Sequence, residues 1–381
     1  MTVDNLSYGK RICREIGCAA TGRVSAAELP PADMVQYFCD SQHLHALFAS
    51  SLSLRRIIPP DYQPLIAQGR ALAAKQIKID ILENELSRRF TQANIRHIVL
   101  KGSHTRLFYP SVLSRTSADM DWHISPADKN RAHALLIEDG WTLKTADNNE
   151  RCYEKAPRAR LELHLTPDGF RASQKQQIQT MFDRAVAVDG LRCHLTDSDA
   201  YVYAVFHLYK HFVLAGAGVR MFLDVYMMEM RGVPDRRDVD KALTLLDCAG
   251  FAARVHQINE VLFGGADSNA DMDTLIQYVF AAGAYGDTAA QLALEAVNTP
   301  IANRSRFNRI LHNYCFDLAS MKTRYPCLER SALWYPFCAI HRVCHGLRFR
   351  RSTLRKTITD QQQSRAHSED FRRILELASI L

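Results

Sequence analysis

The chain has 381 residues, of which 47% are hydrophobic and 23% charged, and this balance excludes an intrinsically disordered protein. Its net charge of +7 fits binding of a polyanion such as a nucleotide or a nucleic acid, without establishing it. The ten cysteines include no Cys-x-x-Cys pair, so they predict reduced thiols and no zinc site. Neither a membrane-spanning apolar run nor a secretion signal is recognisable, and we therefore expect a cytoplasmic protein.

Residues 1–93 are predicted to be a helical N-terminal region that packs on the core. Residues 1–24 show no clear period, whereas residues 32–54 repeat apolar side chains at helical spacing. Pro59 and Pro60 interrupt this pattern. Residues 62–92 then form the longest predicted helix, with leucine and isoleucine side chains along one side.

Residues 94–195 alternate short strand and helix patterns and form the predicted core. Helices are expected at residues 103–108, 127–138 and 173–186. Strands are expected at residues 95–100, 118–124, 141–144, 151–155, 160–165 and 191–195, the last of them at an edge. The pattern predicts an α+β fold with a small mixed sheet that is backed by helices on one side.

From residue 196 to residue 381 the strand patterns disappear, and we expect an all-helical C-terminal lobe. Helices are predicted at residues 197–214 and 219–230, and another from Pro234. The segment 341–356 holds six lysine and arginine residues and no acid. It is either a solvated helix face or the binding site of an anionic partner, such as RNA or a membrane surface.

Three acidic residues lie where two predicted strands would present them together. Asp119 and Asp121 are two residues apart on the strand at 118–124, so their side chains project from the same face. Residues 160–165 alternate strictly, which places Glu162 and His164 on the polar face of a later strand. Adjacent carboxylates repel each other unless a cation lies between them, and Mg²⁺ is the usual occupant of an all-oxygen site.

A phosphate-binding loop is predicted just before these acids. Lys101, Gly102 and Ser103 follow the first strand and precede a helix-like segment. A small Gly-Ser pair in this place lets the backbone approach phosphate oxygens. Lys101 is a natural counter-charge for phosphate, although a lysine at the end of a strand is also often simply solvated. Strand, Gly-Ser, helix and Asp-x-Asp in this order indicate metal-dependent chemistry on a nucleoside triphosphate.

The motifs LKGSH, DMDWHI, LELHL and KHFVLAGAGVRMFLDV together resemble the family of uncharacterised bacterial nucleotidyltransferases, within the superfamily of the DNA polymerase β-like fold. The resemblance covers residues 30–235, with a weaker echo in MKTRYPCLERSALWYPF. It implies a nucleotidyltransferase core at residues 94–195. One departure is His104, where related sequences often carry a small residue, so that the phosphate loop is more crowded.

The resemblance also implies roles for particular residues. Asp119, Asp121 and Glu162 would be catalytic and would hold Mg²⁺, or Mn²⁺ in its place. A nucleoside triphosphate, expected to be ATP, would be bound by the residues Lys101, Gly102, Ser103, Arg115, His211 and Arg220.

Two of these assignments have structural alternatives. Arg220 either reaches the triphosphate or pairs with Asp224, four residues along the same predicted helix. His207 and His211 have the spacing of two zinc ligands but lack a third one, so a cleft-facing histidine is the preferred interpretation.

The predicted activity is transfer of a nucleoside monophosphate from a metal-bound triphosphate to an unknown acceptor, with release of pyrophosphate. The acceptor would be a small molecule, a peptide or RNA. Two alternatives remain open: a toxin-like nucleotidyltransferase that acts on tRNA or protein, and a non-catalytic accessory protein that binds a nucleotide within a biosynthetic cluster.

Overall fold

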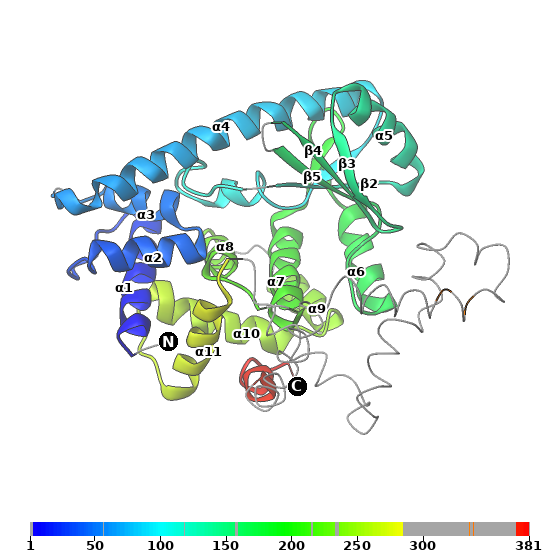
Figure 1. Ribbon diagram of the computed structural model, residues 1–381. Coiled ribbons are helices and arrows are strands. Elements are labelled where there is room, and N and C mark those ends of the chain that lie inside the picture. The colour runs from blue at the N-terminus through cyan, green and yellow to red at the C-terminus, as the bar shows by residue number, and fades with distance from the viewer. Residues whose placement is uncertain are drawn as a thin grey trace. The chain divides into compact units, whose positions relative to one another are not determined.

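The computed structural model describes residues 3–55, 57–117, 119–156, 159–214, 216–232, 236–284, 335, 338 and 371–380. The chain divides into two compact units, one of Met1–Gly286 with Glu376–Leu381 and one of Asp287–Leu375. All helices and strands named below belong to the first unit (Figure 1). The predicted domain boundaries after residues 93 and 195 fall inside it and stay a prediction. The basic segment 341–356 and Pro234 lie outside the described residues.

Before the first strand, the described chain forms the helices α1 (Val3–Ala20), α2 (Ala32–Gln42), α3 (His45–Leu52) and α4 (Gln63–Gln92). The last three confirm the helical patterns at 32–54 and 62–92. Helix α1 was not predicted as an element, and its buried side combines Leu6, Ile12 and Ile16 with the small residues Gly9 and Gly17. A Cβ atom at Gly9 would collide with Phe280, and one at Gly17 would collide with Phe263. Glycine thus allows close packing of α1 at these two positions.

A seven-stranded mixed sheet follows, in the order β3-β4-β5-β2-β1-β7-β6. Its strands are β1 (His97–Val99), β2 (Met120–Ile124), β3 (Thr142–Ala146), β4 (Glu150–Lys155), β5 (Ala159–His164), β6 (Val186–Asp189) and β7 (Arg192–His194). β2 is parallel to β5 and β1 is parallel to β7, whereas the other neighbours are antiparallel. The α+β fold with a mixed sheet is therefore confirmed.

The sheet corrects two details of the prediction. The strand predicted at 191–195 is not an edge strand, because β7 lies between β1 and β6. The edge strand β6 was not predicted, since its four residues are all exposed and carry no pattern of buried positions. Residue 186, expected to end a helix, instead begins this strand, and α6 (Ala172–Asp183) stops before it.

Helices cover both faces of the sheet, whereas the prediction placed them on one face only. Helices α4 and α5 (Lys129–Glu138) lie on one face, where Trp122, Leu161 and Leu163 join their apolar core. Helices α6 and α7 (Asp197–Leu214) approach the opposite face, and the ring of His123 lies 4.4 Å from that of Phe182 in α6. Figure 1 shows α4 and α5 above the sheet and α6 and α7 below it. The second face is the one that matters for chemistry, because the polar side chains of β2 and β5 project from it.

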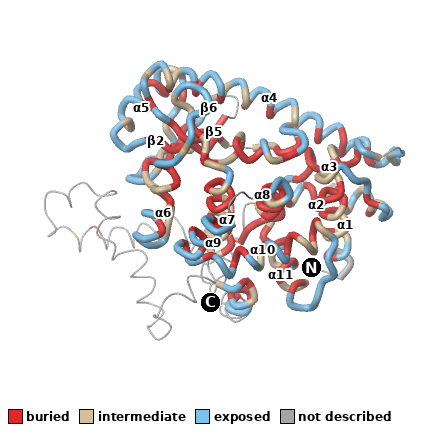
Figure 2. The backbone as a smooth tube through the Cα atoms, turned by 180° about the vertical axis from the view of Figure 1, so that it is seen from behind, coloured by how far each residue is buried: buried red, intermediate tan, exposed pale blue. Residues whose placement is uncertain are grey.

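After β7 the described part of the chain up to residue 284 is helical, as expected. Helices α7 and α8 (Val219–Met230) match the predicted ranges, and α9 (Arg236–Leu245), α10 (Ala249–Asn259) and α11 (Ala270–Ala282) follow. Helices α7 and α8 are largely buried, whereas α4 and α5 expose their outer sides (Figure 2). None of the described helices is both long and apolar enough to cross a membrane.

The buried side chain of Gln42 joins the N-terminal helices to the helical second half. Its Oε1 accepts a hydrogen bond of 3.0 Å from the backbone N–H of Val219, at the start of α8. Its Nε2 donates one of 2.9 Å to the carbonyl oxygen of Phe280 in α11. The first helices therefore pack on α8 and α11 as well as supporting the sheet through α4.

Candidate active site

Two carboxylates meet on neighbouring strands at the centre of the sheet. β2 and β5 run parallel with Asp121 opposite Glu162. Their side chains project away from α4, because their strand neighbours Trp122 and Leu161 belong to the apolar core beneath that helix. Asp121 is only 3% exposed. Asp119 lies just before β2 and is partly exposed, so the sheet fixes Asp121 more firmly than Asp119.

Lys101 places a positive charge on this carboxylate centre. It follows β1 directly, and its Nζ lies 2.9 Å from Asp121 Oδ1. Burial alone would raise the pKa of Asp121, but Lys101 and His164 together hold that pKa well below its usual range. Burial opposes the charge of Lys101 in the same way, and Asp121 nevertheless raises the pKa of the lysine. The two groups therefore stay ionised and form a buried ion pair.

The other two carboxyl groups hold their protons more tightly. Burial and the charge of Asp121 raise the pKa of Glu162 to about 6, even though Arg160 Nη2 lies 2.7 Å from Glu162 Oε1. Burial and Asp121 likewise raise the pKa of Asp119. The centre thus combines one firmly ionised carboxylate with two that are shifted toward neutrality, because like charges so close together cannot all ionise easily.

His164 is a member of this centre that the sequence reasoning missed. Asp121, Glu162 and His164 each offer a ligand atom, and these atoms all lie within 4.8 Å of one another. The Nε2 of His164 lies 3.3 Å from Asp121 Oδ1. The signal was visible in the alternation of residues 160–165, which put His164 on the face of Glu162, but no role was given to it.

Gly102 and Ser103 form the loop between β1 and the carboxylate strand. Gly102 has φ +65°, and a Cβ there would lie 3.2 Å from Ser117 Oγ, so glycine suits both the backbone and the space. The hydroxyl of Ser103 donates a hydrogen bond of 2.8 Å to Glu83 Oε1 in α4. The helix expected at 103–108 is only a 3₁₀ turn, η2 (Thr105–Phe108). Phosphate binding by this loop stays a prediction.

A protein family described as uncharacterised nucleotidyltransferase matches residues 31–264, which is more than half of the chain. The chain belongs to this family. No curated protein and no solved structure shows a significant match to it. The matched region contains both carboxylate strands, the loop after β1 and helices α7 and α8. The family confirms the predicted resemblance and supports nucleotidyl transfer as the general activity.

In this member of the family Arg115 is buried and pairs with a carboxylate of helix α8. Its Nε and Nη2 donate to the two carboxylate oxygens of Asp224 in α8, at 2.9 and 2.8 Å. The hydroxyl of Tyr109 donates to the same carboxylate at 2.6 Å. Asp224 thus has Arg115 as an arginine partner, and the alternative pair of Asp224 with Arg220 stays open. The predicted role of Arg115 in nucleotide binding stays untested, but its guanidinium is already committed to α8.

Arg220 lies one turn before Asp224, and its Nη1 lies 3.4 Å from the carbonyl oxygen of Thr116. Thr116 belongs to the loop that leads into β2. The positive charge of Arg220 also acts on Asp119, whose pKa it lowers in part. Arg220 therefore stands at the entrance of the carboxylate strand, where its predicted role as a phosphate ligand stays open.

Helix α7 brings basic and neutral nitrogen groups to the same place. His207 Nε2 lies 3.3 Å from Lys101 Nζ, and the ring of His211 lies 4.4 Å from the ring of His207. Burial and the charge of Lys101 lower the pKa of His211 to about 4, so both histidines are neutral. Lys210, between them, pairs with Asp168 at 2.9 Å. The cleft-facing position and the nucleotide contact of His211 both stay predictions.

His104 packs against β7, next to the loop that it was expected to crowd. It is 4% exposed, and its ring stacks on His194 of β7 with 4.5 Å between the ring centroids. Burial and Arg192 lower its pKa to about 4. The unusual residue after the Gly-Ser pair is thus accommodated by packing on β7.

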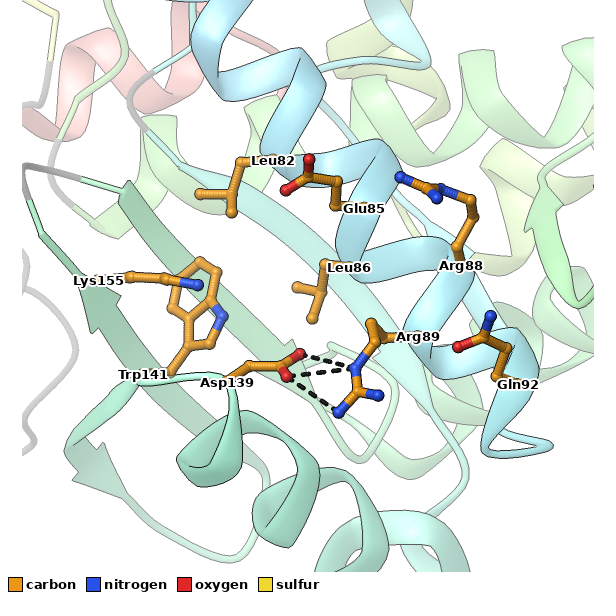
Figure 3. A pocket seen from close by; sticks show the side chains of 9 residues that line it. All are labelled: Leu82, Glu85, Leu86, Arg88, Arg89, Gln92, Asp139, Trp141 and Lys155. Carbon is orange, nitrogen blue, oxygen red and sulfur yellow. Dashed lines mark hydrogen bonds and ion pairs between the residues drawn. The ribbon is translucent and has the colours of Figure 1, made fainter.

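A hollow of about 320 Å³ lies on the other side of the sheet. Leu82, Leu86 and Trp141 line it. Leu86 and Trp141 belong to the apolar core beneath α4, and Leu82 packs against that core. Figure 3 shows Arg89 and Asp139 paired across its floor, with Lys155 over the Trp141 ring. The sheet separates this hollow from Asp121 and Glu162.

Proposed function

We propose that the protein transfers a nucleoside monophosphate from a nucleoside triphosphate, expected to be ATP, to an acceptor hydroxyl, phosphate or amine group. The observation that carries this proposal is the register of β2 and β5, which sets Asp121 opposite Glu162 beside Lys101. Membership of the nucleotidyltransferase family supports the reaction class. The acceptor atom would attack the α-phosphorus, and the bond to the bridging oxygen would break to release pyrophosphate.

The donor atoms in the site fit a divalent cation. Asp121 and Glu162 provide carboxylate oxygens that converge within 4.8 Å, and Asp121 already neutralises the buried ammonium of Lys101. Asp119, Asp121 and Glu162 would hold Mg²⁺ or Mn²⁺. When bound, the cation would supply charge stabilisation for the phosphate oxygens.

The chain's own groups would do the rest. As the alternative to binding the cation, Glu162, with its pKa raised to about 6, is suited to accept the proton of the acceptor group near neutral pH. Lys101 and the backbone at Gly102 and Ser103 would contact the terminal phosphates. Because the Ser103 hydroxyl is bonded to Glu83, we assign this contact to the main chain of the loop.

The test is isothermal titration of the full chain with each of the four nucleoside triphosphates, with and without Mg²⁺. Asp121→Asn should abolish metal-dependent binding, and the same change at the exposed Asp267 should leave it intact. Binding that survives in Asp121→Asn would refute the assignment of the site.

Incubation with α-labelled triphosphate would then distinguish the acceptor classes. Labelled RNA or labelled protein would favour a toxin-like enzyme, and a labelled small molecule would favour a biosynthetic one. Tight, metal-dependent binding without transfer to any acceptor would identify a non-catalytic nucleotide-binding protein.

A further inference from the structure

The imidazole of His164 occupies an unusual position for a site that is otherwise made of carboxylates. The residue is 8% exposed, and its Nε2 lies 3.3 Å from Asp121 Oδ1. It shares the 4.8 Å cluster of ligand atoms with Asp121 and Glu162. The strands impose this arrangement, because Glu162 and His164 are two residues apart on β5, and β2 pairs with β5 in register.

A second carboxylate, that of Glu150, lies next to the other ring nitrogen of His164, Nδ1. The register of β4 and β5 sets Glu150 opposite His164, and Glu150 Oε2 lies 3.5 Å from His164 Nδ1. A histidine that binds a metal through Nε2 must carry its proton on Nδ1, and such ligands commonly donate that proton to a carboxylate. Glu150, His164 and Asp121 follow this sequence of carboxylate, imidazole and metal site.

We propose that His164 is a nitrogen ligand of the cation site, and that the site therefore selects a first-row transition ion, represented by Mn²⁺, over Mg²⁺. Imidazole is a good ligand for transition ions, whereas Mg²⁺ takes oxygen ligands and retains its waters. The use of this ion in nucleotidyl transfer rests on the proposed function, but its binding does not.

Lys101 has a second interaction partner besides Asp121, which it can keep when a cation binds Asp121. Its ammonium lies 2.9 Å from the same Oδ1 that His164 approaches, so it competes with a metal for this oxygen. His207 Nε2, at 3.3 Å, gives the ammonium a second neighbour on α7. Loss of the contact with Asp121 therefore does not leave Lys101 without a partner.

The experiment measures Mn²⁺ binding to the full chain by electron paramagnetic resonance, with electron spin echo modulation to detect a nitrogen ligand. The wild-type protein should bind Mn²⁺ more tightly than Mg²⁺ and show ¹⁴N coupling. His164→Gln should lose the coupling and weaken Mn²⁺ binding by about 10-fold to 100-fold. Its Mg²⁺ affinity should change much less. The control His133→Gln, on α5 across the sheet, should behave as wild type.

Glu150→Gln is the second variant, and it keeps the proposal testable if His164→Gln does not fold. It should retain the ¹⁴N coupling while binding Mn²⁺ about 10-fold more weakly, since only the orientation of the ring is affected. Absence of the coupling in wild type, or its persistence in His164→Gln, would overturn the proposal.

The Asp121→Asn variant separates the two levels of inference. If it abolishes Mn²⁺ binding while wild type shows no ¹⁴N coupling, the carboxylate site stands and only the role of His164 fails. If Asp121→Asn binds Mn²⁺ like wild type, both the proposed function and the role of His164 fail.

Discussion

Asp224 illustrates how a single buried charge fixes the loop that leads to the site. It is 8% exposed and accepts hydrogen bonds from Arg115 and Tyr109, both of which lie between η2 and β2. The loop is thereby attached to α8, far away in sequence. The strand β2, which carries Asp121, begins a few residues after Arg115.

Replacing Asp224 by Asn should lower the free energy of unfolding by about 3 kcal/mol, because Arg115 would stay buried without its counter-charge. Urea unfolding followed by circular dichroism measures the change. The control is Asp247→Asn, whose partner Arg171 is exposed, and there we expect a loss below about 1 kcal/mol. Equal losses in the two variants would contradict a structural role for the Arg115–Asp224 pair.

At the residue scale, the sequence predicted the carboxylates but not their partners. Asp121 and Glu162 follow from strand alternation, which local spacing reveals. The contacts of Asp224 with Arg115, and of Ser103 with Glu83, depend on tertiary packing between distant segments. No spacing rule contains that information, so Arg115 received a functional role while its structural one went unseen.

Helix α4 is the element that connects the sheet to the phosphate loop. It carries three polar residues at helical spacing, the buried Gln76 and Glu83 and the partly exposed Asp80. Gln76 Oε1 accepts a hydrogen bond of 2.6 Å from the backbone N–H of Ser117, and Arg106 Nη1 lies 2.6 Å from Asp80 Oδ1. These residues hold the segment between β1 and β2 from one side, just as Asp224 holds it from the other.

Glu83 is the most consequential of the three. Its Oε1 accepts hydrogen bonds from the Ser103 hydroxyl at 2.8 Å and from the indole N–H of Trp122 at 3.1 Å. Glu83→Ala should therefore destabilise the protein by about 3 kcal/mol, since the buried indole N–H of Trp122 and the partly buried hydroxyl of Ser103 lose their acceptor. Glu83→Gln, which retains an acceptor oxygen, should lose less.

Chemical unfolding of both variants beside the exposed control Glu85→Ala would test this prediction. The control should change stability by less than about 0.5 kcal/mol. If Glu83→Ala is as stable as the control, the polar residues of α4 do not hold the loop.

At the same scale, elements with a regular buried face were predicted well and the others were not. The long helix α4 and the helices α7 and α8 coincide with their predicted ranges within a residue. Helix α1 interrupts its apolar buried positions with Gly9 and Gly17, and β6 has no buried side at all. Strand order also lay beyond reach, because the position of β7 beside β1 is a property of the whole sheet.

The protein has several buried histidines that are neutral in the folded state, and its stability therefore depends on pH. His97, His104 and His123 are all under 9% exposed, and burial lowers the pKa of each from 6.5 to about 4. Below pH 6.5 the unfolded chain therefore binds protons that the folded chain does not. The contribution of these three histidines to the free energy of unfolding is fully present above pH 6.5 and is lost as the pH falls toward 4.

Each of these three histidines lowers the free energy of unfolding by about 3 kcal/mol when the pH falls to 4. The sum of the three losses is as large as the total stability of an ordinary domain. Glu162 acts in the opposite direction, because its raised pKa favours the folded state on acidification, but by only about 2 kcal/mol. We therefore expect acid unfolding between pH 6 and pH 4, seen as a steep fall in the urea midpoint.

The matched variant is His104→Gln, which removes one of the three groups away from the carboxylates. Its stability should depend less on pH between 6 and 5, by up to about 1.4 kcal/mol per pH unit. An unchanged pH dependence in this variant would show that His104 is not neutral in the folded protein.

The sheet order has a consequence for the time at which the site comes into existence. The chain leaves the ribosome with its N-terminus first. Asp121 can be paired only after β5 at residues 159–164 has been made, and β1 can pair with β7 only after residues 192–194 have been made. The contact between Lys101 and His207 comes later still. The loop, the acids and the lysine are thus synthesised early and remain unassembled until more than half of the 381 residues have been made.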